Sequence, residues 1–409
     1  MAVTEPDTTT DARPAYDLLD PAFYVGDQHA AYRWMRANEP VYRDDANAMW
    51  GITRHADLHE VERRNDVFVS GQGYRSFHSP GESNMIAQDD PRHADQRALV
   101  SRRFTPKAVR QHEAWLRSTI DALLDDFGDD QVEVVDAVAA QLPSRFTAKL
   151  LGWDESRWRD VKRWSERLMR LDGIGRDPQL AMDVMMTILE FNGDLTEMLA
   201  ASKGCPVHDA PDLVTVWANA EIDGATLDPE SVMHETGLFI SGGAETTRTV
   251  IARALRTFCD HPDQWEAMAA DPSTVPTAVE EMIRWVTPLN NMFRTAAVDT
   301  EVGGQAIAAG DRLALLYPSA NRDEAVFTDP FTFDTTRNPN PHLGFGFGTH
   351  FCLGASLARY ELVLLFTELA RRFTNLRVVT EIDGEANIFA NAVISFTLGY
   401  DTRKQPRAR

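Results

Sequence analysis

The longest helical pattern in the sequence lies between Asp228 and Cys259. Asp228 is a suitable N-cap, Pro229 stands at the first helical position, and the apolar pattern continues to about Cys259, ahead of Pro262. Most of the remaining chain also has helical periodicity. Short strands and turns are expected in the C-terminal third, before a last helix over about 355–373. The sequence therefore predicts a mainly α (α+β) fold with small β-sheets.

The composition limits the classes of partner and the number of domains. Lys and Arg total 41 and Asp and Glu total 62 in 409 residues, which gives a formal net charge of −21. This charge argues against a general affinity for nucleic acid or anionic membrane, and no apolar run is long enough to span a bilayer. No linker divides the chain, so we expect one domain over 17–401, between a disordered N-terminal tail (1–16) and a C-terminal tail (402–409).

The cysteines and the N-terminal segment indicate the cellular compartment in which the protein is expected. Three cysteines are too few and too scattered for a disulfide framework, which favours a reducing compartment. The first residues are polar and acidic and lack the basic and apolar regions of a signal peptide. We therefore expect a cytoplasmic protein. Nothing in the sequence demands an oligomer, so a monomer is expected.

The stretch HLGFGFGTHFCLGASLARYELVLL, over 342–365, places one cysteine just ahead of a helical pattern. Its glycines do not fit the dinucleotide fingerprint G-x-G-x-x-G, because neither possible register ends on glycine. His342, His350 and Cys352 do not have the usual zinc spacing and lack a fourth ligand. A nucleophilic cysteine would need an oriented histidine base, and a buried structural cysteine is also possible.

Haem fits this stretch better than these alternatives. Cys352 directly precedes a helix, where free N–H groups and the positive end of the helix dipole favour a thiolate. Phe345 and Phe351 supply apolar walls. Glycine allows the backbone to approach a flat macrocycle and to turn its amides toward the sulfur. The glycines concerned are Gly344, Gly346, Gly348 and Gly354.

The spacing Phe345-x-x-Gly348-x-His350-x-Cys352-x-Gly354 resembles the haem-ligand signature of the cytochromes P450. The resemblance extends over nearly the whole chain and implies the triangular, helix-rich single domain of that family. It also implies haem b, with Cys352 as the thiolate ligand of the iron, and O2 as oxidant. The electrons would come from NAD(P)H through a ferredoxin reductase and a ferredoxin.

Three further segments resemble motifs of the same family. In GGAETT, within the long helix, Thr246 would hydrogen-bond dioxygen and Glu245, expected to face a cavity, would relay protons. Without the resemblance, this acid and alcohol would be assigned to a solvated helix face. The pair Glu281 and Arg284, with Arg337 further along, resembles a buried structural triad, although a surface ion pair is the ordinary reading of such spacing.

The third segment, DDPRHADQRALVSRRFTP, places His93 and Arg97 on one helical face. In the family such a pair binds the haem propionates, which suit the fork geometry of arginine. Other residues that the resemblance places at the haem are Arg294, Phe345, Gly346, His350 and Gly354. Arg102 and Arg103, in the same segment, would form a basic patch for the ferredoxin, although solubility alone also explains them.

The substrate is expected to be apolar. Several segments look like the soluble actinobacterial enzymes that hydroxylate sterol side chains and branched lipids, whereas the loop over 70–88 matches those enzymes least. A terpenoid or another secondary metabolite is the alternative substrate. A peroxide-driven haem-thiolate enzyme and a non-catalytic haem-binding protein are the alternative classes. By position, the expected pocket residues are Met85, Ile86, Phe239, Gly242, Leu289, Met292 and Ile394.

Overall fold

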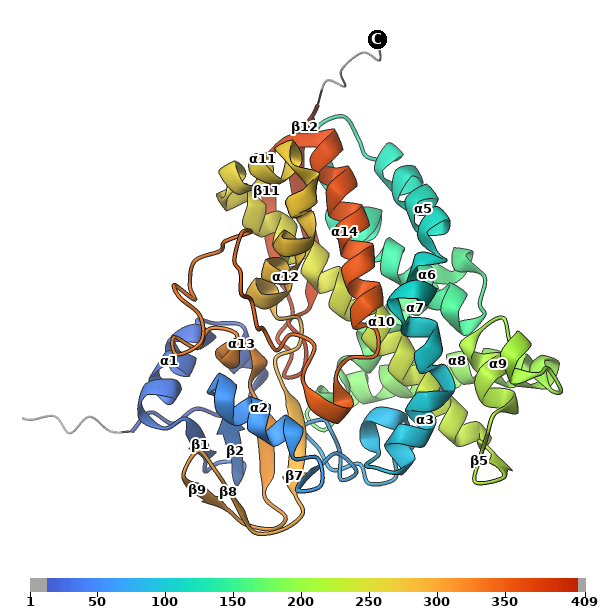
Figure 1. The fold of residues 1–409 in the computed structure, drawn as a ribbon, viewed down its shortest axis with the longest axis vertical. Coiled ribbons are helices and arrows are strands. Elements are labelled where there is room, and N and C mark those ends of the chain that lie inside the picture. The colour runs from blue at the N-terminus through green and yellow to red at the C-terminus, as the bar shows by residue number, and fades with distance from the viewer. Residues whose placement is uncertain (1–12, 404–409) are drawn as a thin grey trace, which may run out of the picture.

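The longest helix, α10 (Pro229–Asp260), crosses the middle of the molecule, with the other large helices packed around it (Figure 1). The computed structural model describes residues 13–403. The Asp228 carboxylate accepts a 2.8 Å hydrogen bond from the Ser231 amide, and Pro229 occupies the first turn, as the sequence predicts. The other helices are α1 (Gln28–Asn38), α2 (His55–Arg63), α3 (Arg92–Ser101), α4 (Pro106–Arg110), α5 (Glu113–Asp125), α6 (Gln141–Leu151), α7 (Trp158–Leu168), α8 (Pro178–Ser202), α9 (Leu213–Asn219), α11 (Pro262–Ala270), α12 (Val275–Val286), α13 (Tyr317–Ala320) and α14 (Ala355–Arg372).

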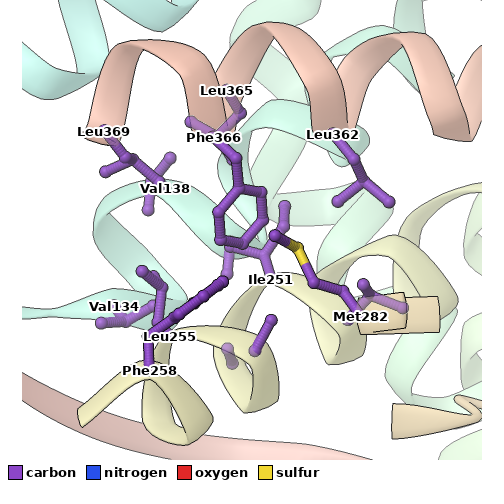
Figure 2. Packing of buried hydrophobic residues seen from close by; sticks show 14 of the residues in the cluster. Val134, Val138, Ile251, Leu255, Phe258, Met282, Leu362, Leu365, Phe366 and Leu369 are labelled. Atoms are coloured by element: carbon purple, nitrogen blue, oxygen red, sulfur yellow. The ribbon is translucent and has the colours of Figure 1, made fainter. Parts of the chain in front are cut away.

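The main hydrophobic core lies between α10, α12 and α14. Figure 2 shows side chains of α14 pointing toward side chains of α10, with a methionine of α12 between them. Burying each large apolar side chain stabilises the fold by about 1.5–3 kcal/mol. This packing fixes α14, and with it the loop that precedes α14, relative to α10. The labelled residues are Val134, Val138, Ile251, Leu255, Phe258, Met282, Leu362, Leu365, Phe366 and Leu369.

A five-stranded sheet, in the order β1-β2-β10-β7-β3, lies beside α1 and α2 (Figure 1). β1 and β2 form an antiparallel hairpin, with Val41 opposite Ile52. Arg294 is placed by β7, where it lies opposite Leu313 of β10. The strands of this sheet are β1 (Val41–Asp44), β2 (Met49–Ile52), β3 (Phe68–Val69), β7 (Met292–Ala296) and β10 (Arg312–Leu315).

The C-terminal part differs from the sequence-based prediction, which placed no strands after the last helix. After α14 the chain forms β11 (Phe373–Gly384) and β12 (Val393–Thr402), which pair with each other and with β4 (Gln131–Glu133). Trp265 buries its indole under this sheet and donates to the Phe373 carbonyl. The two small remaining hairpins are β5 (Glu221–Ile222) with β6 (Ala225–Thr226), and β8 (Thr300–Val302) with β9 (Gln305–Ile307).

The ordered domain is slightly longer than expected at both ends. Arg13 forms ion pairs with Glu39 and Asp45, so the assignment of 13–16 to a disordered tail is wrong. Arg403 donates to the Phe373 carbonyl and pairs with Glu266, so 402–403 belong to the domain as well. The rest of both predicted tails lies outside the described residues. Over the described range, no helix is long and apolar enough to cross a membrane.

Candidate active site

A large cavity separates α10 from the loop that precedes α14. Thr246 and Gly242 of α10 line one side, and Phe345 and Cys352 line the opposite side. Apolar side chains from α10, from the segment after α12 and from the loop over 70–88 form most of the remaining wall. A cysteine and a threonine that are 106 positions apart in the sequence therefore share one cavity.

The Cys352 thiol lies in a tight turn directly before α14. Its amide donates a 2.9 Å hydrogen bond to the Phe345 carbonyl, which closes the loop around the sulfur. Burial raises the pKa of the thiol, whereas the backbone N–H groups of Gly354 and Ala355 and the charge of Arg97 oppose this increase. These groups stabilise a thiolate, the form of cysteine that binds a metal.

Two glycines of this loop have a role that the sequence did not predict. The predicted role was to let the backbone approach a macrocycle. Gly346 and Gly348 have φ angles of +65° and +68°, a region in which side chains are strained. A Cβ atom at Gly348 would lie only 2.5 Å from the Glu62 carbonyl oxygen, and one at Gly346 would lie 2.9 Å from Glu62 Oε1. These two glycines therefore allow the loop to pack tightly against α2.

Positively charged and hydrogen-bond-donating side chains gather at one end of the cavity. His93, Arg97, Arg294 and His350 all line it, and the rings of His93 and His350 lie 4.3 Å apart. Arg97 donates to the Phe351 carbonyl at 2.7 Å, and Arg294 donates to its neighbour's carbonyl at 2.8 Å. Burial and these arginines lower the pKa of His350 to about 2.

Two carboxyl groups lie near this cluster, because Asp90 pairs with His93 at 3.3 Å and the buried Glu62 lines the same cavity. Within residues 13–403, no carboxylate forms an ion pair with Arg97 or Arg294. Two free guanidinium groups beside an apolar cavity fit a ligand with carboxylates, which arginine binds through paired hydrogen bonds. Haem carries two propionates on an apolar macrocycle, and Cys352 offers a thiolate inside the same cavity. The residues present therefore fit haem b.

Thr246 and Glu245 have different environments although they are adjacent. Thr246 lines the cavity and donates a 2.9 Å hydrogen bond to the Gly242 carbonyl one turn earlier. Glu245 is buried outside the cavity lining, where Arg248 hydrogen-bonds to it and also pairs with Glu166 of α7. The prediction that Glu245 faces the cavity is therefore wrong, because the arginine three positions later holds the carboxylate elsewhere. Burial raises the pKa of Glu245 to about 7.

The predicted structural triad of Glu281, Arg284 and Arg337 is present in the structure. Arg284 donates two 2.7 Å hydrogen bonds to the Glu281 carboxylate, and both side chains are completely buried. Arg337 adds a third contact at 3.1 Å. The alternative, a solvated ion pair on a helix surface, is excluded by this burial.

Six of the seven expected pocket residues line the cavity. They are Met85, Ile86, Phe239, Gly242, Leu289 and Met292. The seventh assignment is wrong, because Ile394 is 46% exposed. Side chains alternate between the faces of a strand, and on β12 the buried neighbour Val393 takes the inner face.

Several further groups line the cavity that were not predicted from the sequence. Tyr74, Arg75, Met169 and Phe389 line it, although the segments that contribute them are remote in sequence. The buried Arg75 pairs with the equally buried Asp172 at 2.8 Å, which joins the loop over 70–88 to the segment between α7 and α8. Two sequence signals could have indicated some of these groups: the loop over 70–88, which already supplied Met85 and Ile86 and also contains Tyr74 and Arg75, and the apolar run around Phe389.

The predicted basic patch also needs correction. Arg102 is exposed, but Arg103 is partly buried and donates a hydrogen bond to the Ala210 carbonyl. Arg103 therefore ties the end of α3 to the segment before α9 and is not a free surface cation.

Comparison with known proteins agrees with this site. The family described as Cytochrome P450 matches residues 208–381. A steroid C26-monooxygenase of Mycobacterium tuberculosis (strain ATCC 25618 / H37Rv) is 39% identical over 373 residues, covering 90% of this chain and 92% of the relative. A methyl-branched lipid omega-hydroxylase of Mycobacterium bovis is 36% identical, covering 82% and 80%. A linalool 8-monooxygenase of Pseudomonas putida is 34% identical, covering 87% and 91%.

Solved structures show the same fold. A Mycobacterium marinum cytochrome P450 in complex with pseudoionone superposes with a TM-score of 0.86 at 31% identity, covering 96% of this chain and 100% of that chain. The thiol before α14, the threonine of α10 and these relatives lead to one assignment: the chain belongs to the cytochrome P450 family and is a cytochrome P450 monooxygenase.

Proposed function

We propose that the protein inserts one oxygen atom from O2 into a C–H bond of a steroid side chain or a methyl-branched lipid. The observation that carries this proposal is the single cavity that joins Cys352 and Thr246, with walls that are otherwise mainly apolar. An apolar cavity favours a substrate of the same character. The steroid and branched-lipid hydroxylases among the relatives support the substrate class.

In this proposal Cys352 provides the thiolate ligand of haem iron, and Phe345, Gly346 and Gly354 surround that ligand. Haem b, when bound, supplies the activation of O2, which amino-acid side chains do not provide. Arg97 and Arg294 would bind the propionates with positive charge that no carboxylate pairs within residues 13–403, and the histidine rings of His93 and His350 would contribute N–H donors beside them. These four side chains would hold the propionate end of the haem when it is bound.

Thr246 and Glu245 manage protons. The Thr246 hydroxyl reaches the cavity and can donate to oxygen there. Glu245, with a pKa of about 7, holds or releases a proton near neutral pH. Since Glu245 lies outside the cavity lining, its proton must travel through water or by a side-chain rotation away from Arg248. This pair argues against a purely peroxide-driven enzyme and against a haem carrier, neither of which needs protons delivered to O2.

Electrons come from NAD(P)H through a ferredoxin reductase and a ferredoxin. The exposed cations Arg102, Lys107 and Arg110 follow α3 and offer an acidic ferredoxin a local positive surface on a protein of net charge −21. Reversal of Arg102 to glutamate should slow ferredoxin-driven turnover and leave peroxide-driven turnover unchanged. Equal losses in the two assays would contradict this docking surface.

A second substrate class has specific support. One relative is named a linalool 8-monooxygenase, and one structural neighbour was solved in complex with pseudoionone. Linalool and pseudoionone are both acyclic terpenoids. The protein would then oxidise a terpenoid with the same residues. The two classes differ in length and branching, so binding measurements can separate them.

The deciding experiment is a spectral titration of the haem protein with matched ligands. Steroids, methyl-branched fatty acids, unbranched fatty acids of equal length and acyclic terpenoids are compared by the change in iron spin state on binding. We expect steroids or branched acids to bind at least tenfold more tightly than unbranched acids. Phe239→Ala should weaken this binding, whereas Ile394→Ala, at an exposed position, should not. Tighter binding of acyclic terpenoids than of steroids and branched acids would instead assign a terpenoid substrate.

The haem ligand is tested separately. Cys352→Ala should abolish the thiolate-type Soret band of the reduced carbon-monoxide complex. Cys259→Ala is a matched control, because that half-buried thiol lies on α10 away from the cavity and donates only to the Leu255 carbonyl. Retention of the thiolate-type band by Cys352→Ala would overturn the assignment.

A further inference from the structure

A second cavity, of about 440 Å³, lies behind α10 and shares no lining residue with the haem cavity. Its walls come from α10, the C-terminal end of α12, the segment around the start of α1, and the end of β11. Its lining holds three arginines and two glutamates together with six apolar or aromatic side chains. A cavity of this kind has no part in oxidising an apolar substrate.

Arg322 is buried in the wall of this cavity without a carboxylate partner. Its side chain is only 4% exposed, and it donates one 2.7 Å hydrogen bond to the Trp285 carbonyl at the end of α12. Its guanidinium lies 4.6 Å from the centre of the Trp285 ring. A guanidinium has five N–H donors, so this carbonyl leaves several of them for another acceptor. Burial and the nearby Arg284 lower the pKa of Arg322 to about 9.

Arg253 of α10 is the second such cation. It donates to the carbonyls of Asn391 and Ala392, at 2.9 Å and 3.4 Å, and burial lowers its pKa to about 10. Within residues 13–403, neither Arg253 nor Arg322 forms an ion pair with a carboxylate. Both positive charges are therefore held without a direct ion pair of the kind that buried ions normally have, although the Glu281 carboxylate also acts on Arg322.

Other charged groups at the cavity do not supply this counter-charge. Glu381 pairs with Arg256, which also pairs with Asp260. Glu385 pairs with Arg170 at 2.6 Å. The carboxylates of the lining are thus already engaged, and the excess charge belongs to Arg253 and Arg322.

His29 gives an independent indication of a missing partner. It lines the same cavity, and its Nδ1 atom is buried with no hydrogen-bond partner. Burial and the charges of Arg322, Arg36 and Arg33 lower its pKa to about 2, so the ring is neutral and can donate from one nitrogen. A neutral donor near the Arg322 guanidinium, in a cavity that Arg253 also lines, is a suitable surrounding for an oxyanion.

We propose that this cavity binds a doubly charged oxyanion of the phosphate class through Arg253, Arg322 and His29. Two guanidinium groups match the charge of a phosphate near neutral pH, and their fork geometry suits its oxygens. The ligand is either free inorganic phosphate or the phosphate group of a monoester. The site does not depend on the substrate of the haem cavity.

The test uses isothermal titration of the full-length haem protein with inorganic phosphate at pH 7.5, with ionic strength held constant by chloride. We expect Arg253→Met to weaken phosphate binding at least tenfold. Arg256→Met is the matched control, because Arg256 lines the same cavity but is already paired with Glu381 and Asp260. The affinity of this variant for phosphate should stay within twofold of the wild-type value. Arg322→Lys, which keeps the charge and loses the fork, should also weaken binding.

Each outcome decides the proposal or its ligand. Absence of phosphate binding to the wild-type protein, or equal weakening in Arg253→Met and Arg256→Met, would overturn it. If Arg322→Lys fails to fold, Arg253→Met and Arg256→Met still give the comparison. Acetate binding as tight as phosphate would refute the requirement for a double charge. Glycerol phosphate binding more tightly than phosphate would identify a monoester as the ligand, and weaker binding would identify the free ion.

Discussion

Replacement of Glu281 by glutamine removes one negative charge from the centre of a fully buried cluster. The Glu281 carboxylate accepts two hydrogen bonds from Arg284 and one each from Arg337, the Asp334 amide and Asn340. Glutamine keeps the shape but leaves two guanidinium groups without a counter-charge. Breaking a buried ion pair in this way costs about 3–5 kcal/mol. Since a folded protein is stable by about 5–15 kcal/mol, this is a large fraction of the total.

The cost is measured by guanidinium-induced unfolding, followed by circular dichroism and by the Soret absorbance. The denaturation midpoint should fall with little change in slope, and haem should be lost at lower denaturant than in wild type. Glu60→Gln is the matched control, because Glu60 and Arg64 form a partly exposed i,i+4 pair at 2.8 Å, and helix pairs of this spacing near the surface contribute about 0.3–0.5 kcal/mol. Equal, small midpoint shifts for the two variants would refute the reasoning.

Three further predictions concern other buried polar groups. Burial raises the pKa of Glu235 to about 8, so the folded state keeps a proton on this group that the unfolded state releases above about pH 4.3; the contribution of Glu235 to stability should fall by about 1.4 kcal/mol per unit from pH 5 to 8, and Glu235→Gln should reduce the slope of stability against pH by that amount, while Glu62, Glu245 and Glu361, whose pKa values burial also raises, keep the rest of the slope. Asp172→Asn leaves the buried Arg75 unpaired, and amide exchange over 70–88 should become several-fold faster. Thr246→Ala should lower the product formed per NAD(P)H consumed, whereas Thr249→Ala, outside the cavity lining, should leave this ratio unchanged.

The sequence predicted those parts of the site whose signals are local. The glycines, aromatic residues and cysteine over 345–354 lie in one continuous segment. At the start of α10, the N-cap Asp228 and the first helical residue Pro229 are adjacent. His93 and Arg97 share a helical face for the same reason. In each case the residues that form the feature are close in sequence, so their spacing alone predicts how they lie relative to one another.

The errors arose where a distant or competing partner decides the position of a side chain. The orientation of Glu245 depends on Arg248 and on Glu166 of another helix, and the sequence gives no register between α7 and α10. Arg103 is drawn to a carbonyl more than one hundred positions away. Ile394 shows a different failure, because strand alternation would have predicted its exposure if β12 had been recognised as a strand.

The two sides of the haem cavity are therefore built on different principles. The thiolate side is one continuous segment held against α2 and the main core by glycine turns and apolar packing. The far side brings together segments from three distant parts of the chain, joined by a few buried polar contacts such as Arg75 with Asp172 and Asn387 with the Met169 carbonyl. Substitutions on the far side can change which molecule fits without disturbing the iron ligand. Substrate range should consequently diverge among relatives more readily than the chemistry, which agrees with steroid, lipid and terpenoid hydroxylases at similar identity to this chain.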